Sequence, residues 1–127
     1  MKKKIILGLA GLLISSSAFA GFQLISNVSS INAKTTVVSC GGGNPIPAIF
    51  NQNVQWGVVK MIFLGGKSSA TCTFTYTPSN TVIGTGMLTI ANDLHSGTVT
   101  NITSGANYKV DVSGNGTENV NLTLSSK

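Results

Sequence analysis

The sequence has no arginine, a single histidine and only three acidic residues. Arginine supplies the bidentate contacts to phosphates and base edges, and the lysines present are scattered along the chain rather than clustered. These features exclude nucleic acid as a partner. A zinc site usually needs three or four protein ligands, and His95, the only histidine, lacks the partners to complete one. We therefore expect no metal and no cofactor.

The shortage of carboxylates also limits catalysis. Glycosidases need two facing carboxylates, and Asp111 and Glu118 instead flank an Asn-Gly hairpin, where exposed charges serve solubility. Asp93, His95 and Ser96 are the residue types of a serine-hydrolase triad. Three such residues in one turn cannot orient one another as a triad requires. We expect no catalytic residues, no enzymatic activity and a solvated histidine.

The first twenty residues, MKKKIILGLAGLLISSSAFA, have the three parts of a secretory signal peptide. Three lysines precede the apolar residues 5–14, and Ala18-Phe19-Ala20 has the small-x-small pattern of a cleavage site. The apolar run is shorter than the roughly 20 residues of a membrane-spanning helix. The sequence predicts cleavage between Ala20 and Gly21. Residues 21–127 would then form one secreted or periplasmic domain without a transmembrane segment, and its net charge falls from +5 to +2 because three lysines leave.

The exported part alternates between apolar and polar residues in short runs. In residues 71–77, Cys72, Phe74 and Tyr76 share one face and threonines occupy the other, which is typical of a half-buried strand. Gly84 and Gly86 predict a bulge or bend in the following strand. Five strands are predicted between about residues 70 and 125, at residues 71–77, 81–91, 98–103, 108–112 and 120–124.

The upstream half contains three further predicted strands, at residues 22–31, 35–40 and 54–64. The run from Val54 to Leu64 is apolar on both faces apart from Gln55 and Lys60. This pattern predicts a central strand covered on both sides, or a strand whose second face meets a partner. Seven or eight short strands with regular turns indicate a small immunoglobulin-like antiparallel β-sandwich, with a small soluble β-barrel as the alternative.

The two cysteines, Cys40 and Cys72, are expected to form a disulfide. Both would enter an oxidising compartment, and each shares a predicted strand face with a core residue, Val38 and Phe74 respectively. Closing a loop of about 33 residues stabilises a fold by roughly 3.7 kcal/mol through loop-closure entropy. The glycines after Cys40 would let the chain turn away from the bond. The segment SCGGGNPIPAIF lacks the lysine and hydroxyl of a phosphate-binding loop, and a reactive thiol at Cys40 would be exposed to pairing with Cys72.

One short segment, Ser104-Gly105-Ala106-Asn107-Tyr108, resembles the SGxxY motif of periplasmic C-type lysozyme inhibitors. Those proteins are small exported β-barrels that insert a loop into the lysozyme cleft. The resemblance covers these five residues and implies an exported enzyme inhibitor in which Ser104 and Tyr108 make the contact.

Four Asn-x-Ser/Thr triplets are present, but a chain this rich in asparagine, serine and threonine contains about as many by chance. Their number therefore carries almost no information about glycosylation; they begin at Asn27, Asn101, Asn115 and Asn121.

With this inventory, we expect a non-catalytic exported β-sandwich that acts as a binding or surface-assembly module. Its partner would be a protein or a glycan of the cell envelope, or a second copy joined through strand edges.

Overall fold

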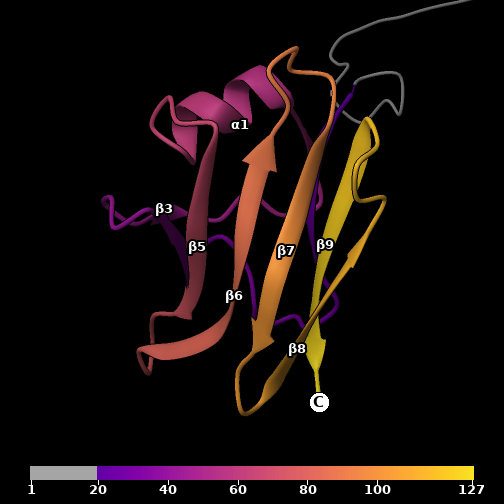
Figure 1. Ribbon diagram of the computed structural model, residues 1–127. Coiled ribbons are helices and arrows are strands. Elements are labelled where there is room, and N and C mark those ends of the chain that lie inside the picture. The colour runs from indigo at the N-terminus through magenta and orange to yellow at the C-terminus, as the bar shows by residue number, and fades with distance from the viewer. Residues whose placement is uncertain (1–19) are drawn as a thin grey trace, which may run out of the picture.

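The computed structural model describes residues 20–127, which form two β-sheets packed face to face and one short helix (Figure 1). The four-stranded sheet has, in spatial order, β4 (Asn53–Gln55), β1 (Gly21–Ser26), β9 (Asn119–Ser126) and β8 (Tyr108–Ser113). The five-stranded sheet has β3 (Ile46–Pro47), β2 (Thr36–Cys40), β5 (Ser69–Tyr76), β6 (Thr81–Ile90) and β7 (Gly97–Ser104). The helix is α1 (Trp56–Ile62).

The predicted β-sandwich is confirmed. The predicted signal peptide lies outside the described residues except for Ala20, which leads directly into β1 at Gly21. All neighbouring strand pairs of the two sheets are antiparallel except β1 and β9, which run parallel over six residue pairs and place Phe22 beside Val120. The weak strand predicted for residues 22–31 ends earlier, at Ser26.

The five strands predicted in the second half of the chain are present as β5 to β9. In β5, Cys72 and Phe74 are buried and the threonines between them lie on the more exposed face, as the alternation predicts. The predicted irregularity in β6 is confirmed too, because its pairing shifts register beside Gly84 and again at Gly86. A Cβ atom at Gly84 would collide with the Val110 side chain and lie 2.9 Å from the Thr103 carbonyl oxygen. Glycine therefore allows β8 of the opposite sheet to pass close to β6.

The expected strand over residues 54–64 is wrong: β4 ends at Gln55 and the chain continues as α1. The buried positions after Val54 are Trp56, Val59, Phe63 and Leu64, so the spacing changes from two residues before Trp56 to three and then four after it. In a strand, Lys60 would lie on the same face as Trp56 and would be buried with it. In the helix, Lys60 is half-buried and lies beside the face of α1 that points away from the core. This outer face is also apolar, which hid the helical period in the sequence.

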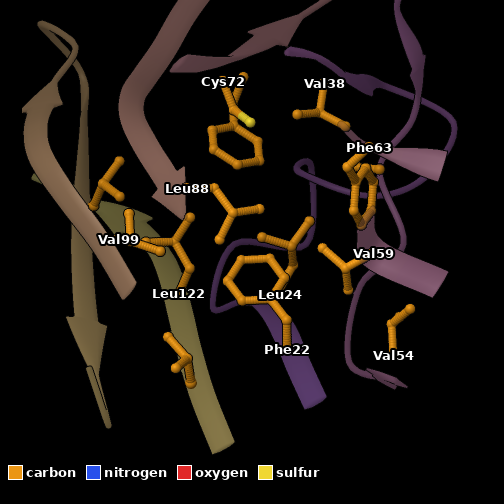
Figure 2. Packing of buried hydrophobic residues seen from close by; sticks show 14 of the residues in the cluster. Phe22, Leu24, Val38, Val54, Val59, Phe63, Cys72, Leu88, Val99 and Leu122 are labelled. Carbon is orange, nitrogen blue, oxygen red and sulfur yellow. The ribbon is translucent and has the colours of Figure 1, made fainter. Parts of the chain in front are cut away.

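The core lies between the two sheets, and α1 closes one end of it. Figure 2 shows Val59 of α1 and Phe63, the residue after the helix, directed into the core near Leu24 and Val38. Trp56 is 1% exposed, and its ring lies 6.1 Å from the ring of Phe22, centroid to centroid. The helix is thus anchored by its inner face, and only its outer face remains for contact with other molecules.

The open side of the sandwich between β7 and β8 is closed by the β8–β9 hairpin. The Asn115 side chain accepts a hydrogen bond from the Val99 amide (2.7 Å) and donates one to the Val99 carbonyl oxygen (2.8 Å). It therefore pairs with the edge of β7 as a neighbouring strand would. At the C-terminal end of β7, the Val110 amide on the β8 edge donates a hydrogen bond to Ser104 Oγ at 3.0 Å. The amide of Asn115 is occupied by the fold and is not free for modification in the folded protein.

Replacing Asn115 with alanine is expected to destabilise the domain by about 1–2 kcal/mol, because two hydrogen bonds to the buried Val99 are lost. Chemical denaturation followed by circular dichroism measures the loss. Asn107→Ala is the matched control, since Asn107 lies exposed in the β7–β8 connection, and it should change stability by less than about 0.5 kcal/mol. Equal effects of the two substitutions would show that the Asn115 bonds contribute nothing.

Candidate functional site

The end of the sandwich that carries α1 exposes a group of large apolar side chains. Three lie on the outer face of the helix: Val58 is 45% exposed, Met61 66% and Ile62 41%. Leu94, in the turn between β6 and β7, is 38% exposed, and its Cδ1 atom is 3.8 Å from where a Cβ of Gly57 would lie. We call these four residues, Val58, Met61, Ile62 and Leu94, the α1 patch. Contiguous exposed apolar surface is the usual mark of an interaction site.

Leu94 is held in an unfavourable backbone conformation. Its φ is 62°, in the left-handed region that costs a non-glycine residue on the order of 1 kcal/mol. The turn around it is fixed by hydrogen bonds from the Leu94 amide to the Ala91 carbonyl oxygen (2.9 Å) and from the His95 amide to Asp93 Oδ1 (3.1 Å). The turn therefore holds an apolar side chain beside the helix with 38% of its surface left exposed.

A hollow of about 560 Å³ lies next to the α1 patch. The indole of Trp56 forms part of its wall and is held in place because Nε1 donates a hydrogen bond to the Glu118 carbonyl oxygen at 2.9 Å. The same oxygen accepts a hydrogen bond from the Gly21 amide at 2.8 Å. We call this space the Trp56 hollow; it is lined by Ala20, Gln55, Trp56, Gly57, Leu94, His95 and Glu118. Ala20 precedes the predicted cleavage site, so in the processed protein the other six residues would line the hollow and the new amino terminus at Gly21 would border it.

Gly57 is an unusual residue for the position that it occupies. A glycine inside a helix costs about 1 kcal/mol relative to alanine. Gly57 is not among the glycines with positive φ, and a Cβ atom placed on it would meet only Leu94 Cδ1, at an ordinary contact distance of 3.8 Å. Packing within the described chain therefore does not require glycine here.

The titratable residues considered for catalysis lie in two places, at the Trp56 hollow and on β8. His95 is exposed and lines the Trp56 hollow together with Glu118. Asp111 lies on β8, where its carboxylate is 3.8 Å from Lys109 Nζ, both side chains being more than half exposed. Within residues 20–127, no three His, Cys, Asp or Glu side chains come close enough together to hold a metal ion.

The predicted disulfide is present between Cys40 on β2 and Cys72 on β5, which face each other in the sheet with Cα atoms 3.9 Å apart. Gly41 and Gly42 follow with φ angles of 64° and 76°, so these glycines turn the chain away from the bond as expected. A smaller hollow of about 190 Å³ separates this turn from the C-terminal end of α1. Neither cysteine is a free thiol.

The segment that resembles lysozyme inhibitors lies at the end of the sandwich opposite α1 (Figure 1). Ser104 Oγ accepts the hydrogen bond from the Val110 amide, and a Cβ on Gly105 would collide with the Val82 carbonyl oxygen. Tyr108 is partly buried and packs against the core. Ser104 and Gly105 thus have structural roles in this connection. An inhibitory role of Ser104 and Tyr108 stays a prediction. It is tested by measuring lysozyme activity with excess purified protein.

Comparisons of this chain with protein-family models, with curated proteins and with solved structures find no match. In the part of the chain that the structure describes, no helix has the length and apolarity needed to cross a bilayer. Sequence reasoning located an apolar segment with a possible partner-facing side at residues 54–64. It placed residues 93–96 in a turn, as observed, but it did not identify the helix, the position of Leu94 beside that helix or the Trp56 hollow, because these features arise only through tertiary packing.

Proposed function

We propose that this protein is an exported, non-catalytic binding or surface-assembly module whose contact surface is the α1 patch. The observation that carries this proposal is the outer face of α1, where three large apolar side chains are 41–66% exposed on a helix firmly anchored by Trp56 and Val59. Leu94, presented by a strained turn, extends the same surface. Apolar side chains held rigidly in solvent gain free energy when a partner covers them.

Export to the periplasm or the cell exterior is supported by two independent features. Residues 1–20 have the charged, apolar and small-residue parts of a signal peptide. The Cys40–Cys72 disulfide belongs to the kind of bond that persists in oxidising compartments. A partner would accordingly be a protein or a glycan of the cell envelope.

We place the contact on the α1 patch rather than on the strand edges. The two edge strands β3 and β4 comprise only two and three residues, and β3 contains Pro47, which lacks an amide proton. On the β7 edge, the Val99 amide donates a hydrogen bond to the Asn115 side chain. On the β8 edge, the Val110 amide donates one to Ser104 Oγ. Short and partly occupied edges offer little template for strand addition by a partner.

A lack of catalysis is favoured by how few titratable groups meet at one place, since of the residues considered only His95 and Glu118 line the Trp56 hollow. His95 and Asp93 lie in the β6–β7 turn, whereas Asp111 lies on β8 of the opposite sheet beside Lys109. General acid–base catalysis needs its acid and base within hydrogen-bonding reach of one substrate.

The triple variant Val58→Ser/Met61→Ser/Ile62→Ser is expected to fold and to lose at least tenfold in affinity for its envelope partner. These side chains face solvent, so the substitutions remove contact area without opening the core. Co-sedimentation of the purified protein with the envelope fraction of the producing cell measures the loss.

The chain offers a closely matched control for this experiment. Val82 on β6 is 45% exposed, the same fraction as Val58, and lies outside the α1 patch. The single variants Val58→Ser and Val82→Ser therefore remove equal apolar exposure at different places. Envelope binding should fall for Val58→Ser only; equal binding of the triple variant and the wild-type protein would contradict the proposal.

A further inference from the structure

The α1 surface carries a protrusion and a recess one helical turn apart. Met61 is the most exposed large apolar side chain of the described residues, at 66%. Gly57, four residues earlier, lines the Trp56 hollow and presents no side chain. Residues at i and i+4 lie on the same face of a helix, about 6 Å apart along its axis. A large side chain and a recess of about 560 Å³ therefore stand next to each other on one face.

Such a surface is complementary to itself. If two copies of α1 pack antiparallel about a twofold axis between Gly57 and Met61, each Met61 faces the Gly57 of the other copy. A twofold interface needs a patch that matches its own image, and this pairing of large with small residues meets that condition. Met is an unbranched, adaptable side chain that fills irregular recesses. A close approach of this kind also explains a glycine that the fold of the single chain does not need.

The charges beside this surface have the same complementarity. Lys60 precedes Met61 on α1, and Glu118 lines the Trp56 hollow. Among residues 20–127 the only ion pair joins Lys109 and Asp111, so neither Lys60 nor Glu118 forms an ion pair with another described residue. In the antiparallel arrangement, the lysine of each copy accompanies its Met61 toward the hollow that holds the other copy's Glu118. The other titratable residues at this end are Lys67 in the loop after α1, and Asp93 and His95 on the β6–β7 turn. Cleavage after Ala20 would add the amino group of Gly21, whose nitrogen lies 2.8 Å from the Glu118 carbonyl oxygen.

We propose that the α1 patch binds a second copy of this chain, as a twofold antiparallel pair of α1 helices with Met61 seated in the Trp56 hollow of the other copy. The proposal rests on the proposed function and names its partner. One seven-residue helix and one turn form an interface at the low end of the size range, below about 1,200 Å² in total. We therefore expect a weak dimer, with a Kd on the order of 10–100 μM.

Gly57→Ala separates association from folding. An added methyl group has room in the single chain, and alanine is the better helix former, so the melting temperature of the monomer should rise by about 3–6 °C. The same methyl group would enter the space of the other copy's Met61, so the dimer should weaken about tenfold. Sedimentation equilibrium of the oxidised, processed protein from about 1 μM to 1 mM measures the Kd, with Val82→Ser as the control that leaves it unchanged.

A charge exchange provides a second test with its own internal control. Lys60→Glu and Glu118→Lys should each weaken the dimer, because each places like charges together across the interface. The double variant restores opposite charges in both symmetry-related pairs, and its Kd should return to within about threefold of the wild-type value. Additive weakening in the double variant would overturn the arrangement.

A wild-type protein that stays monomeric at 1 mM, or a dimer unaffected by Gly57→Ala, also overturns the inference. The envelope co-sedimentation of the Val58→Ser/Met61→Ser/Ile62→Ser variant then decides the fate of the proposed function. If the monomeric wild-type protein binds the envelope fraction and the triple variant does not, the patch serves a different partner. If neither binds, the proposed function fails together with the dimer.

Discussion

Replacing both Cys40 and Cys72 with alanine is expected to lower the free energy of unfolding by about 3–4 kcal/mol. The bond joins residues with a sequence separation of 32. Without it the unfolded chain gains conformational entropy, which lowers the free energy of the unfolded state by roughly 3.7 kcal/mol. Cys72 is 4% exposed and belongs to the core, so its truncation adds a small packing loss. For a domain of this size the change corresponds to a melting temperature lower by roughly 15 °C or more.

Thermal unfolding of the wild-type protein with and without reductant tests this expectation without relying on the variant alone. Reductant should lower the melting temperature of the wild-type protein nearly to that of the double variant. The variant should not respond to reductant, since it has no disulfide left. A double variant as stable as the oxidised protein would show that strand pairing between β2 and β5 alone supplies the stability of this region.

Trp56→Ala is expected to cost about 3–5 kcal/mol and to release α1 from the sandwich. The indole is 1% exposed, packs beside Phe22, and donates the hydrogen bond to the Glu118 carbonyl oxygen that joins α1 to the start of β9. Removing a large buried aromatic side chain leaves a cavity that the surrounding structure fills only in part. The α1 patch depends on this anchor, so envelope binding should be lost together with stability.

Trp56→Phe separates the hydrogen bond from the packing, because phenylalanine keeps most of the ring contact and has no N–H group. We expect it to cost about 1–3 kcal/mol, which lies between the wild-type protein and Trp56→Ala. Denaturant unfolding followed by far-ultraviolet circular dichroism measures both variants, since the chain has no other tryptophan for fluorescence. A cost below about 1 kcal/mol for Trp56→Ala would contradict an anchoring role.

The strands of the second half of the chain could be predicted because each has one buried and one exposed face. In such a strand buried apolar residues alternate with exposed polar ones, so a period of two is visible in the sequence, as at Cys72 and Phe74 in β5. The turns between them are marked by glycine, proline and asparagine, which favour the backbone angles of a reversal. The disulfide followed from the even number of cysteines and their places on inward faces.

The segment from Val54 to Leu64 could not be assigned in this way. It is apolar on two faces, one that packs on the core and one that is exposed, so neither a period of two nor one of 3.6 stands out. Its helical form depends on the space available for Trp56 and Val59 at one end of the sandwich. The role of Asn115 could not be predicted either. The residues around it indicate a hairpin turn, but they do not show that this turn lies against the edge of β7.

The sequence by itself determined the β class, the disulfide pair and the shortage of catalytic groups, since these depend on composition and on local alternation. Only the tertiary structure decided which apolar residues stay exposed. Exposure depends on how α1, the Leu94 turn and the start of β9 come together, and these segments lie far apart along the chain. The α1 patch and the Trp56 hollow therefore result from packing at one end of the sandwich, and no local sequence pattern predicts them.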